Sequence, residues 1–168
     1  MTDLPSYIYL KAMHQRWEVT YVDAPGKLTL EEHPHKQLVV SGRRYSKRAA
    51  LHEINRWVRL KASKFLRKML EKCNEEVKVK YKRVNIRYHK LQWGSYATSQ
   101  TISLNYKLVF LPRVLVKHLL YHELCHVFYL NHSDKFWNKV KKFDKNWEKN
   151  KVALVEANSY IPDWAIIW

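Results

Sequence analysis

Apolar residues recur every three or four positions through residues 46–75, and this period constrains the fold more than any other feature. That spacing places them on one face of an α-helix. Ser46, just before the pattern, is a suitable N-cap because its hydroxyl can accept a hydrogen bond from a first-turn amide. We therefore expect one long amphipathic helix over 46–75, with its apolar face against the rest of the protein. The apolar residues are Leu51, Ile54, Val58, Ala62, Phe65, Met69 and Cys73.

The opposite face of this predicted helix is basic, and so is the whole chain. It carries Lys47, Arg48, Arg56, Arg59, Lys64, Arg67, Lys68 and Lys72. Lysine and arginine outnumber acidic residues 31 to 15, which gives a net charge of +16. Such a charge attracts polyanions at long range, and salt weakens the attraction. DNA or another polyanion is therefore a candidate partner, although charged residues also fill the solvent-facing side of ordinary surface helices.

Short strands are predicted on both sides of the long helix. Apolar and polar residues alternate over 16–22, the period of a half-buried strand, and shorter strands follow at 28–32 and 37–40. Turn residues separate them, so a small antiparallel sheet is expected at the start of the chain. Further strands are expected over 77–88 and 101–104. The pattern favours the α+β class, and a length of 168 residues fits a single domain over 1–168.

Several classes of protein are disfavoured by what the sequence lacks. Its two cysteines, Cys73 and Cys125, are far apart and outside any C-x-x-C motif, so neither a disulfide framework nor a thiolate zinc site is indicated. The first twenty residues do not resemble a secretory signal, and no apolar run approaches the ~18 residues of a membrane span. We expect a soluble, intracellular and cytoplasmic protein that does not associate with membranes. The sequence does not predict an oligomeric state.

The sequence His122-Glu-Leu-Cys-His126 lies in an apolar periodic segment, which predicts a helix over residues 112–131. Pro112 suits its first turn because the missing amide proton would have no partner there. Residues four apart differ by about 40° around a helix, so the two imidazoles project side by side and can bind one metal ion. Glu123 lies beside that pair.

His132 is the third candidate ligand, because it follows His126 by the six residues seen in longer zinc-binding patterns. Asn131 is expected to end the helix in a left-handed conformation and turn the chain back. Three histidines leave one position of a catalytic Zn²⁺ open for water. Zinc would lower the pKa of that water, and Glu123 would accept its proton. His118 is left out of the set because it would lie about 12 Å from His126 along the axis.

A metallopeptidase is the function this motif favours. An extended peptide would be held through backbone hydrogen bonds along the edge of the strand at 101–104. Two alternatives remain open at this point. The same site could hydrolyse a nucleotide phosphoanhydride. Zinc could instead be structural in a nucleic-acid-binding module, although no fourth histidine or cysteine is spaced to close such a site.

Trp93-Gly-Ser, Ile102-Ser-Leu-Asn105, the His122–His126 motif and Asn131-His-Ser-Asp-Lys-Phe-Trp137 together resemble the YgjP-like family of metallopeptidases. The resemblance implies a zincin-type active-site helix, zinc on the three histidines, Glu123 as general base, and a strand pair beside the cleft. The family usually has R-W-G-S-C-S, whereas this chain has Gln92, Tyr96 and Ala97 at the differing positions. The last stretch is also similar to SprT-like and WLM-type proteases, which implies nucleic-acid-associated protein substrates.

Overall fold

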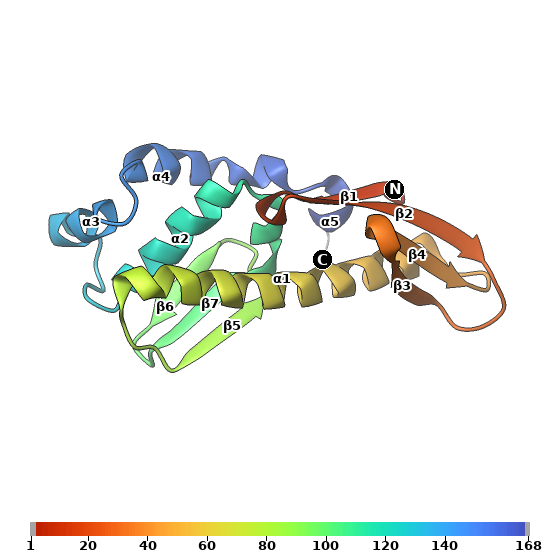
Figure 1. The fold of residues 1–168 in the computed structure, drawn as a ribbon, viewed down its shortest axis with the longest axis horizontal. Coiled ribbons are helices and arrows are strands. Elements are labelled where there is room, and N and C mark those ends of the chain that lie inside the picture. The colour runs from red at the N-terminus through yellow and green to blue at the C-terminus, as the bar shows by residue number, and fades with distance from the viewer. Residues whose placement is uncertain (1–2, 167–168) are drawn as a thin grey trace.

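The structure, a computed structural model, describes residues 3–166 and contains two small sheets linked by a long helix (Figure 1). The first sheet has the strand order β1-β2-β4-β3. Trp17 and Val19 on β2, and Leu38 and Val40 on β4, are buried on the face that the alternation predicted. The elements are β1 (Tyr7–Leu10), η1 (Lys11–Met13), β2 (Gln15–Asp23), β3 (Thr29–His33), η2 (Pro34–Lys36) and β4 (Gln37–Gly42).

This sheet is mixed, which corrects the expectation of a purely antiparallel one. β1 pairs antiparallel with β2, and β3 with β4, but β2 and β4 run parallel, with Val19 opposite Leu38. Side chains alternate with a period of two in either pairing, so the alternation carries no information on strand direction. Gly42 permits a close return of the chain, because an added Cβ would lie 2.8 Å from Cα of Leu28.

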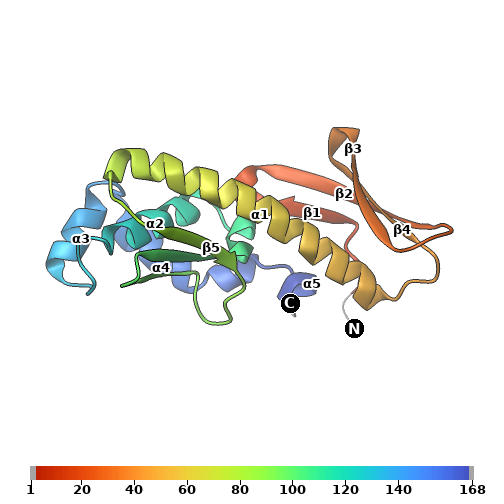
Figure 2. The same ribbon diagram turned by 90° about the horizontal axis from the view of Figure 1, so that it is seen from below.

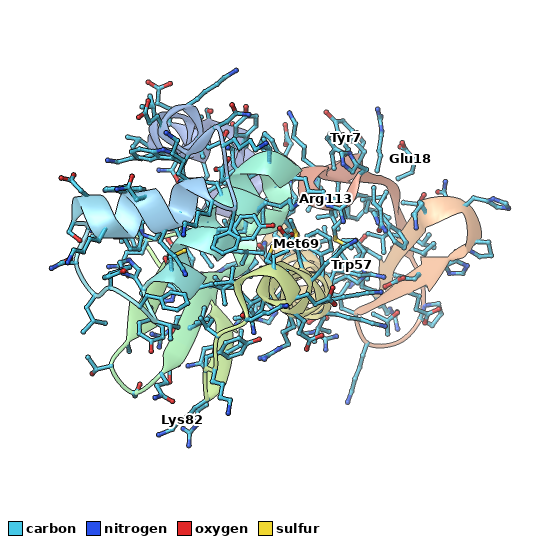
Figure 3. All side chains as sticks on the ribbon, turned by 60° about the vertical axis from the view of Figure 1, so that its left-hand side comes forward. Tyr7, Glu18, Trp57, Met69, Lys82 and Arg113 are labelled. Atoms are coloured by element: carbon cyan, nitrogen blue, oxygen red, sulfur yellow. The ribbon has the colours of Figure 1, made fainter. Side chains whose placement is uncertain are left out.

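The long helix predicted over 46–75 is α1 (Lys47–Val77). Ser46 caps it as expected, since its hydroxyl accepts a 3.1 Å hydrogen bond from the amide of Ala49. The expected apolar stripe faces the interior, with Phe65 partly buried and the other members buried. Figures 1 and 2 show α1 running from the first sheet to the second. In Figure 3, Met69 lies inside the molecule whereas Lys82 points away from it.

The second sheet contains β5 (Arg83–Arg87), β6 (Gly94–Ala97) and β7 (Thr101–Asn105) in the order β5-β7-β6. The strand expected over 77–88 is shorter, because α1 continues to Val77 and residues 78–82 lead out of it. β7 matches the strand expected at 101–104 but is central, paired parallel with β5 and antiparallel with β6. The expectation that its edge holds a peptide is therefore wrong, and β6 is the edge strand on this side.

The remaining elements pack around α1 and the second sheet. They are η3 (Tyr106–Phe110), α2 (Arg113–Cys125), α3 (Asp134–Lys141), α4 (Trp147–Val155), η4 (Ala157–Tyr160) and α5 (Asp163–Ile166). One buried apolar cluster joins both sheets to α1, η3, α2 and α5. A smaller one, Cys125, Phe136 and Val140, lies between α2 and α3. The C-terminal segment packs back on the protein through the buried Trp164, while 167–168 lie outside the described residues.

These elements confirm the α+β class. Within residues 3–166, no helix is both long and apolar enough to cross a membrane. Cys73 and Cys125 are free and buried, in agreement with the absence of a disulfide framework.

Candidate metal centre

The three histidines that the motif singled out converge at the end of α2. Nε2 of His122 lies 3.1 Å from Nε2 of His126 and 3.0 Å from Nε2 of His132. Ligand nitrogens that bind one zinc ion at 2.0–2.1 Å in a tetrahedral arrangement lie about 3.3 Å apart. The spacing of the histidine nitrogens therefore fits a single small cation.

The protonation of these rings also fits metal binding. Nδ1–H of His126 donates a 2.9 Å hydrogen bond to the carbonyl of Tyr129, so the lone pair of the neutral ring is on Nε2. Burial lowers the pKa of His122 to about 3, with further lowering by charge on His126 and His132. Burial also lowers the pKa of His126. Both rings are thus unprotonated near neutral pH, as metal ligands must be.

The chain reverses earlier than predicted, because α2 ends at Cys125 rather than near residue 131. Amides of Phe128 and Tyr129 both donate to the carbonyl of Cys125, which closes a turn directly after the helix. Asn131 is not among the residues with positive φ, so the expectation of a left-handed helix end there is wrong. Backbone hydrogen bonds complete the turn, and His132 reaches the cluster from the following loop.

Aromatic side chains from α3 hold the histidine rings in place. Phe136 stacks on His126 with ring centroids 4.5 Å apart, and Trp137 stacks on His132 at 5.6 Å. Trp137 is itself stacked on Trp147 at 4.6 Å. This packing restricts the rotamers of the rings before any ligand binds, as a precise metal site requires.

Glu123 is buried beside the histidines without a compensating partner. It is 3% exposed, and Oε2 makes no hydrogen bond to the described residues. Burial raises the pKa of its carboxyl group to about 8. Folding alone disfavours such a group, and strongly perturbed carboxyls are concentrated at functional sites.

His122, Glu123 and His132 line one cavity of about 640 Å³. The start of β6 forms its opposite wall, since Trp93 and Gly94 line it and Gly94 pairs with Leu104 on β7. An added Cβ at Gly94 would lie 3.0 Å from Oε1 of Glu123, so glycine makes room for the carboxylate.

The residues that differ from the family pattern lie along the same strand and its approach. Gln92 lines the cavity, and Tyr96 and Ala97 are on β6 opposite Ile102 and Thr101.

His118, which the helix geometry left out of the ligand set, lines the cavity beside the three histidines without joining their group. Its Nδ1–H donates a 2.7 Å hydrogen bond to Oδ2 of Asp144, which also accepts from the side-chain Nδ2 of Asn150. Burial lowers the pKa of His118, although the Asp144 carboxylate opposes this. Asp144 lies 26 residues along the chain and in a different segment, so no local spacing connects the pair.

A family model described as "YgjP-like, metallopeptidase domain" matches residues 4–157. The chain belongs to the YgjP-like family. By family this YgjP-like protein is a metallopeptidase, and the convergence of three histidines and a buried glutamate agrees with that class.

Two solved structures are similar to part of this YgjP-like protein. The metallopeptidase zymogen jannalysin of Methanocaldococcus jannaschii is 17% identical with a TM-score of 0.48, covering 54% of this chain and 94% of its own. The metallopeptidase zymogen abylysin of Pyrococcus abyssi is 22% identical with a TM-score of 0.49, covering 54% of this chain and 92% of its own. No curated protein matches.

Proposed function

We propose that this protein is a zinc-dependent peptidase in which His122, His126 and His132 hold the metal and Glu123 is the general base. The observation that carries the proposal is the convergence of three histidines, with Nε2 of His126 and of His132 at 3.1 and 3.0 Å from Nε2 of His122, next to the buried Glu123, whose Oε2 has no hydrogen-bond partner among the described residues. A divalent zinc ion bound there would supply a Lewis acid that lowers the pKa of water towards ~7 and polarises a carbonyl.

The protein's own groups supply the proton chemistry and the orientation. A pKa of about 8 lets Glu123 both accept and return a proton near neutral pH. β6 offers a free edge beside Glu123, where an extended peptide can add as a further strand through backbone hydrogen bonds. His118 is held by Asp144 at the cavity wall, where it can contact a bound substrate. We further propose that residues 1–168 form one domain, because one apolar cluster joins both sheets.

Metal content and peptide cleavage test the proposal together. We expect purified protein to contain about one zinc ion per chain, because three histidine ligands match the usual catalytic set. His122→Ala should lose the metal. Glu123→Gln should keep the metal and lose cleavage of an unfolded protein. A Glu123→Gln variant with wild-type activity, or wild-type protein that takes up no metal, contradicts the assignment. Faster phosphate release from nucleoside triphosphates than peptide cleavage would favour the phosphoanhydride alternative.

We also propose that the basic face of α1 binds a polyanion such as DNA. All the basic residues named for this helix are exposed, and they extend along its length. Nucleic-acid-associated proteins would then be brought near the cleft as substrates. The net charge of +16 would then attract the nucleic acid to which these substrate proteins are bound.

Salt titration with matched variants tests this surface. Binding to duplex DNA should weaken as salt rises, with a log–log slope of about −0.9 per phosphate contacted. Replacing Lys64, Arg67 and Lys68 by Gln should make the slope shallower. Replacing the exposed lysines 141, 142 and 145 by Gln removes the same charge elsewhere and is the control. Equal losses in both triple variants would show that net charge alone attracts DNA and would refute the α1 surface.

A further inference from the structure

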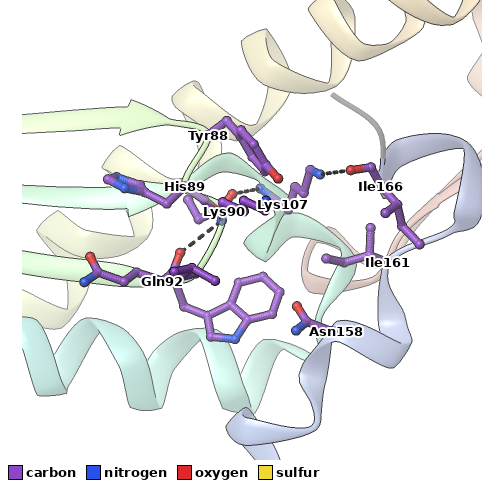
Figure 4. Close-up of a pocket in the computed structure, with 11 residues that line it drawn as sticks. Tyr88, His89, Lys90, Gln92, Lys107, Asn158, Ile161 and Ile166 are labelled. Carbon is purple, nitrogen blue, oxygen red and sulfur yellow. Dashed lines mark hydrogen bonds between the residues drawn. The ribbon is translucent and has the colours of Figure 1, made fainter.

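A second cavity, of about 470 Å³, adjoins the histidine cleft and contains a buried lysine (Figure 4). It shares four lining residues with the cleft, namely Leu91, Gln92, Trp93 and Asn158. Trp93 is fixed between the two cavities because its indole N–H donates a 3.2 Å hydrogen bond to the carbonyl of Leu154. The two cavities therefore form one continuous surface at the start of β6.

Lys107 lines this cavity and is 2% exposed. Its ammonium group donates one hydrogen bond, 3.2 Å long, to the carbonyl of Ile166, and lies 4.3 Å from the centre of the Tyr88 ring. No carboxylate within residues 3–166 forms an ion pair with it. A lysine has three N–H donors, so two donors and the positive charge remain for a ligand.

The loop beside Lys107 is held by hydrogen bonds, and its exposed Lys90 is a second cation lining the same cavity. The side chain of Asn105 donates to the carbonyls of His89 and Gln92, at 2.8 and 3.1 Å, and so holds the loop at the cavity rim. Its Oδ1 accepts a hydrogen bond from the backbone amide of Lys107 at 3.1 Å. Burial lowers the pKa of His89, which keeps that ring neutral at physiological pH.

Burial lowers the pKa of Lys107 to about 8, and the group is still mostly protonated at neutral pH. Among the lining residues Lys107 is buried and Lys90 is exposed, so a single carboxylate is enough to balance the buried charge. In a peptidase, carboxylates are supplied by acidic side chains and by the C-terminus of the substrate. The cavity lies just before Gly94, where a peptide paired along β6 would leave the strand.

We infer that the Lys107 cavity is a substrate subsite that binds a carboxylate of a peptide whose scissile bond lies at the histidine cluster. Lys107 is thus a specificity residue, and the substrate class is peptides with an acidic group a short distance from the cleavage site. This inference rests on the proposed peptidase function.

Matched peptide pairs test the subsite. Quenched fluorescent peptides would carry Glu or Gln at each of three positions on either side of a mapped cleavage site. A second pair would end in a free carboxylate or an amide. We expect one pair to show a preference of about 10- to 100-fold in kcat/KM for the carboxylate, the range of charge-assisted hydrogen bonds. The position of that pair distinguishes a side chain from a C-terminus. Equal rates within every pair for the wild type would overturn the inference without any variant.

Variants then assign the preference to Lys107. Lys107→Met should abolish the preference, so that the variant cleaves both members of each peptide pair at equal rates, because the ammonium charge that distinguishes a carboxylate from an amide is gone. Lys82→Met, on the exposed approach to β5, is the control and should keep the preference. A preference that persists in Lys107→Met would overturn the inference.

Binding without catalysis separates the subsite from the proposed function. Calorimetric titration of the preferred peptide pair onto Glu123→Gln protein should show the same ratio of affinities. Carboxylate-selective binding by a protein that never cleaves a peptide would support the subsite and contradict the peptidase proposal. Cleavage of every peptide pair at equal rates would support the peptidase and contradict the subsite.

Discussion

Gly94→Ala isolates the role of the space between β6 and Glu123. The new Cβ would lie 3.0 Å from Oε1, 3.2 Å from Cγ and 3.3 Å from Cδ of Glu123. Non-bonded carbon atoms prefer separations of about 3.5–4.0 Å, so the carboxylate has to move by roughly 0.5 Å. It can do so because Oε2 has no hydrogen bond to the described residues that would resist the movement.

The displacement should affect catalysis more than stability. A misplacement of about 1 Å in an active site costs roughly 100-fold in rate, so half that distance predicts a loss of about tenfold in kcat. The strain of overpacking, at about 1–3 kcal/mol, is partly offset because alanine suits a strand better than glycine by about 0.5–1 kcal/mol. Peptide cleavage and urea unfolding of the same preparation measure both effects.

Gly42→Ala is the matched control, since it introduces the same methyl group far from the cleft. Its Cβ would lie 2.8 Å from the backbone Cα of Leu28, which cannot rotate away. We expect a loss of about 1–3 kcal/mol in the free energy of unfolding, with kcat unchanged at temperatures where the variant is folded. Wild-type kcat in Gly94→Ala would refute the idea that this glycine positions the carboxylate.

Two further predictions concern buried polar groups. Burial lowers the pKa of Lys107 from 10.5 to about 8, so between these values the unfolded chain holds a proton that the folded chain does not, and stability rises with pH. The free energy of unfolding of Lys107→Met should therefore exceed that of the wild type by about 3 kcal/mol below pH 8 and by little above pH 10.5. Urea titrations that show the same difference at every pH would contradict this. Asp144→Ala removes the acceptor of the buried His118 N–H and should cost about 1–3 kcal/mol in the same assay, whereas Asp3→Ala, which breaks only the exposed contact with Lys47, should have no measurable effect.

The histidine cluster could be foreseen because its geometry is local. Two members lie one helical turn apart on α2, and His132 follows after a short loop, so spacing alone predicts their convergence. The turn itself was assigned to the wrong residue. Backbone hydrogen bonds to the carbonyl of Cys125 end the helix, and the residue types at these positions do not predict such bonds.

Long-range pairings were out of reach of the same reasoning. The pattern of apolar residues predicts β2, β3, β4, β5 and β7 but not β1 or β6, and it does not say which strand is central. The prediction of a peptide-binding edge on β7 fails because β5 and β6 cover both its sides. Lys107 was not identified for a similar reason. Its burial depends on Tyr88 and on Ile166, which are distant from it in the sequence.

Buried polar groups in this fold fall into two kinds, and the difference marks the substrate-binding surface. Asn105 and His118 are paired with neighbouring groups, Asn105 with two backbone carbonyls and His118 with the Asp144 carboxylate. Glu123 and Lys107 are ionisable and buried, and neither forms an ion pair within residues 3–166. Burial raises the pKa of Glu123 and lowers that of Lys107, and both changes favour the neutral form. Burying such a group lowers the free energy of unfolding unless a ligand pairs with it. Unpaired ionisable groups are therefore found mainly at functional sites. Because both lie on cavities that meet at Trp93, one bound peptide can reach both.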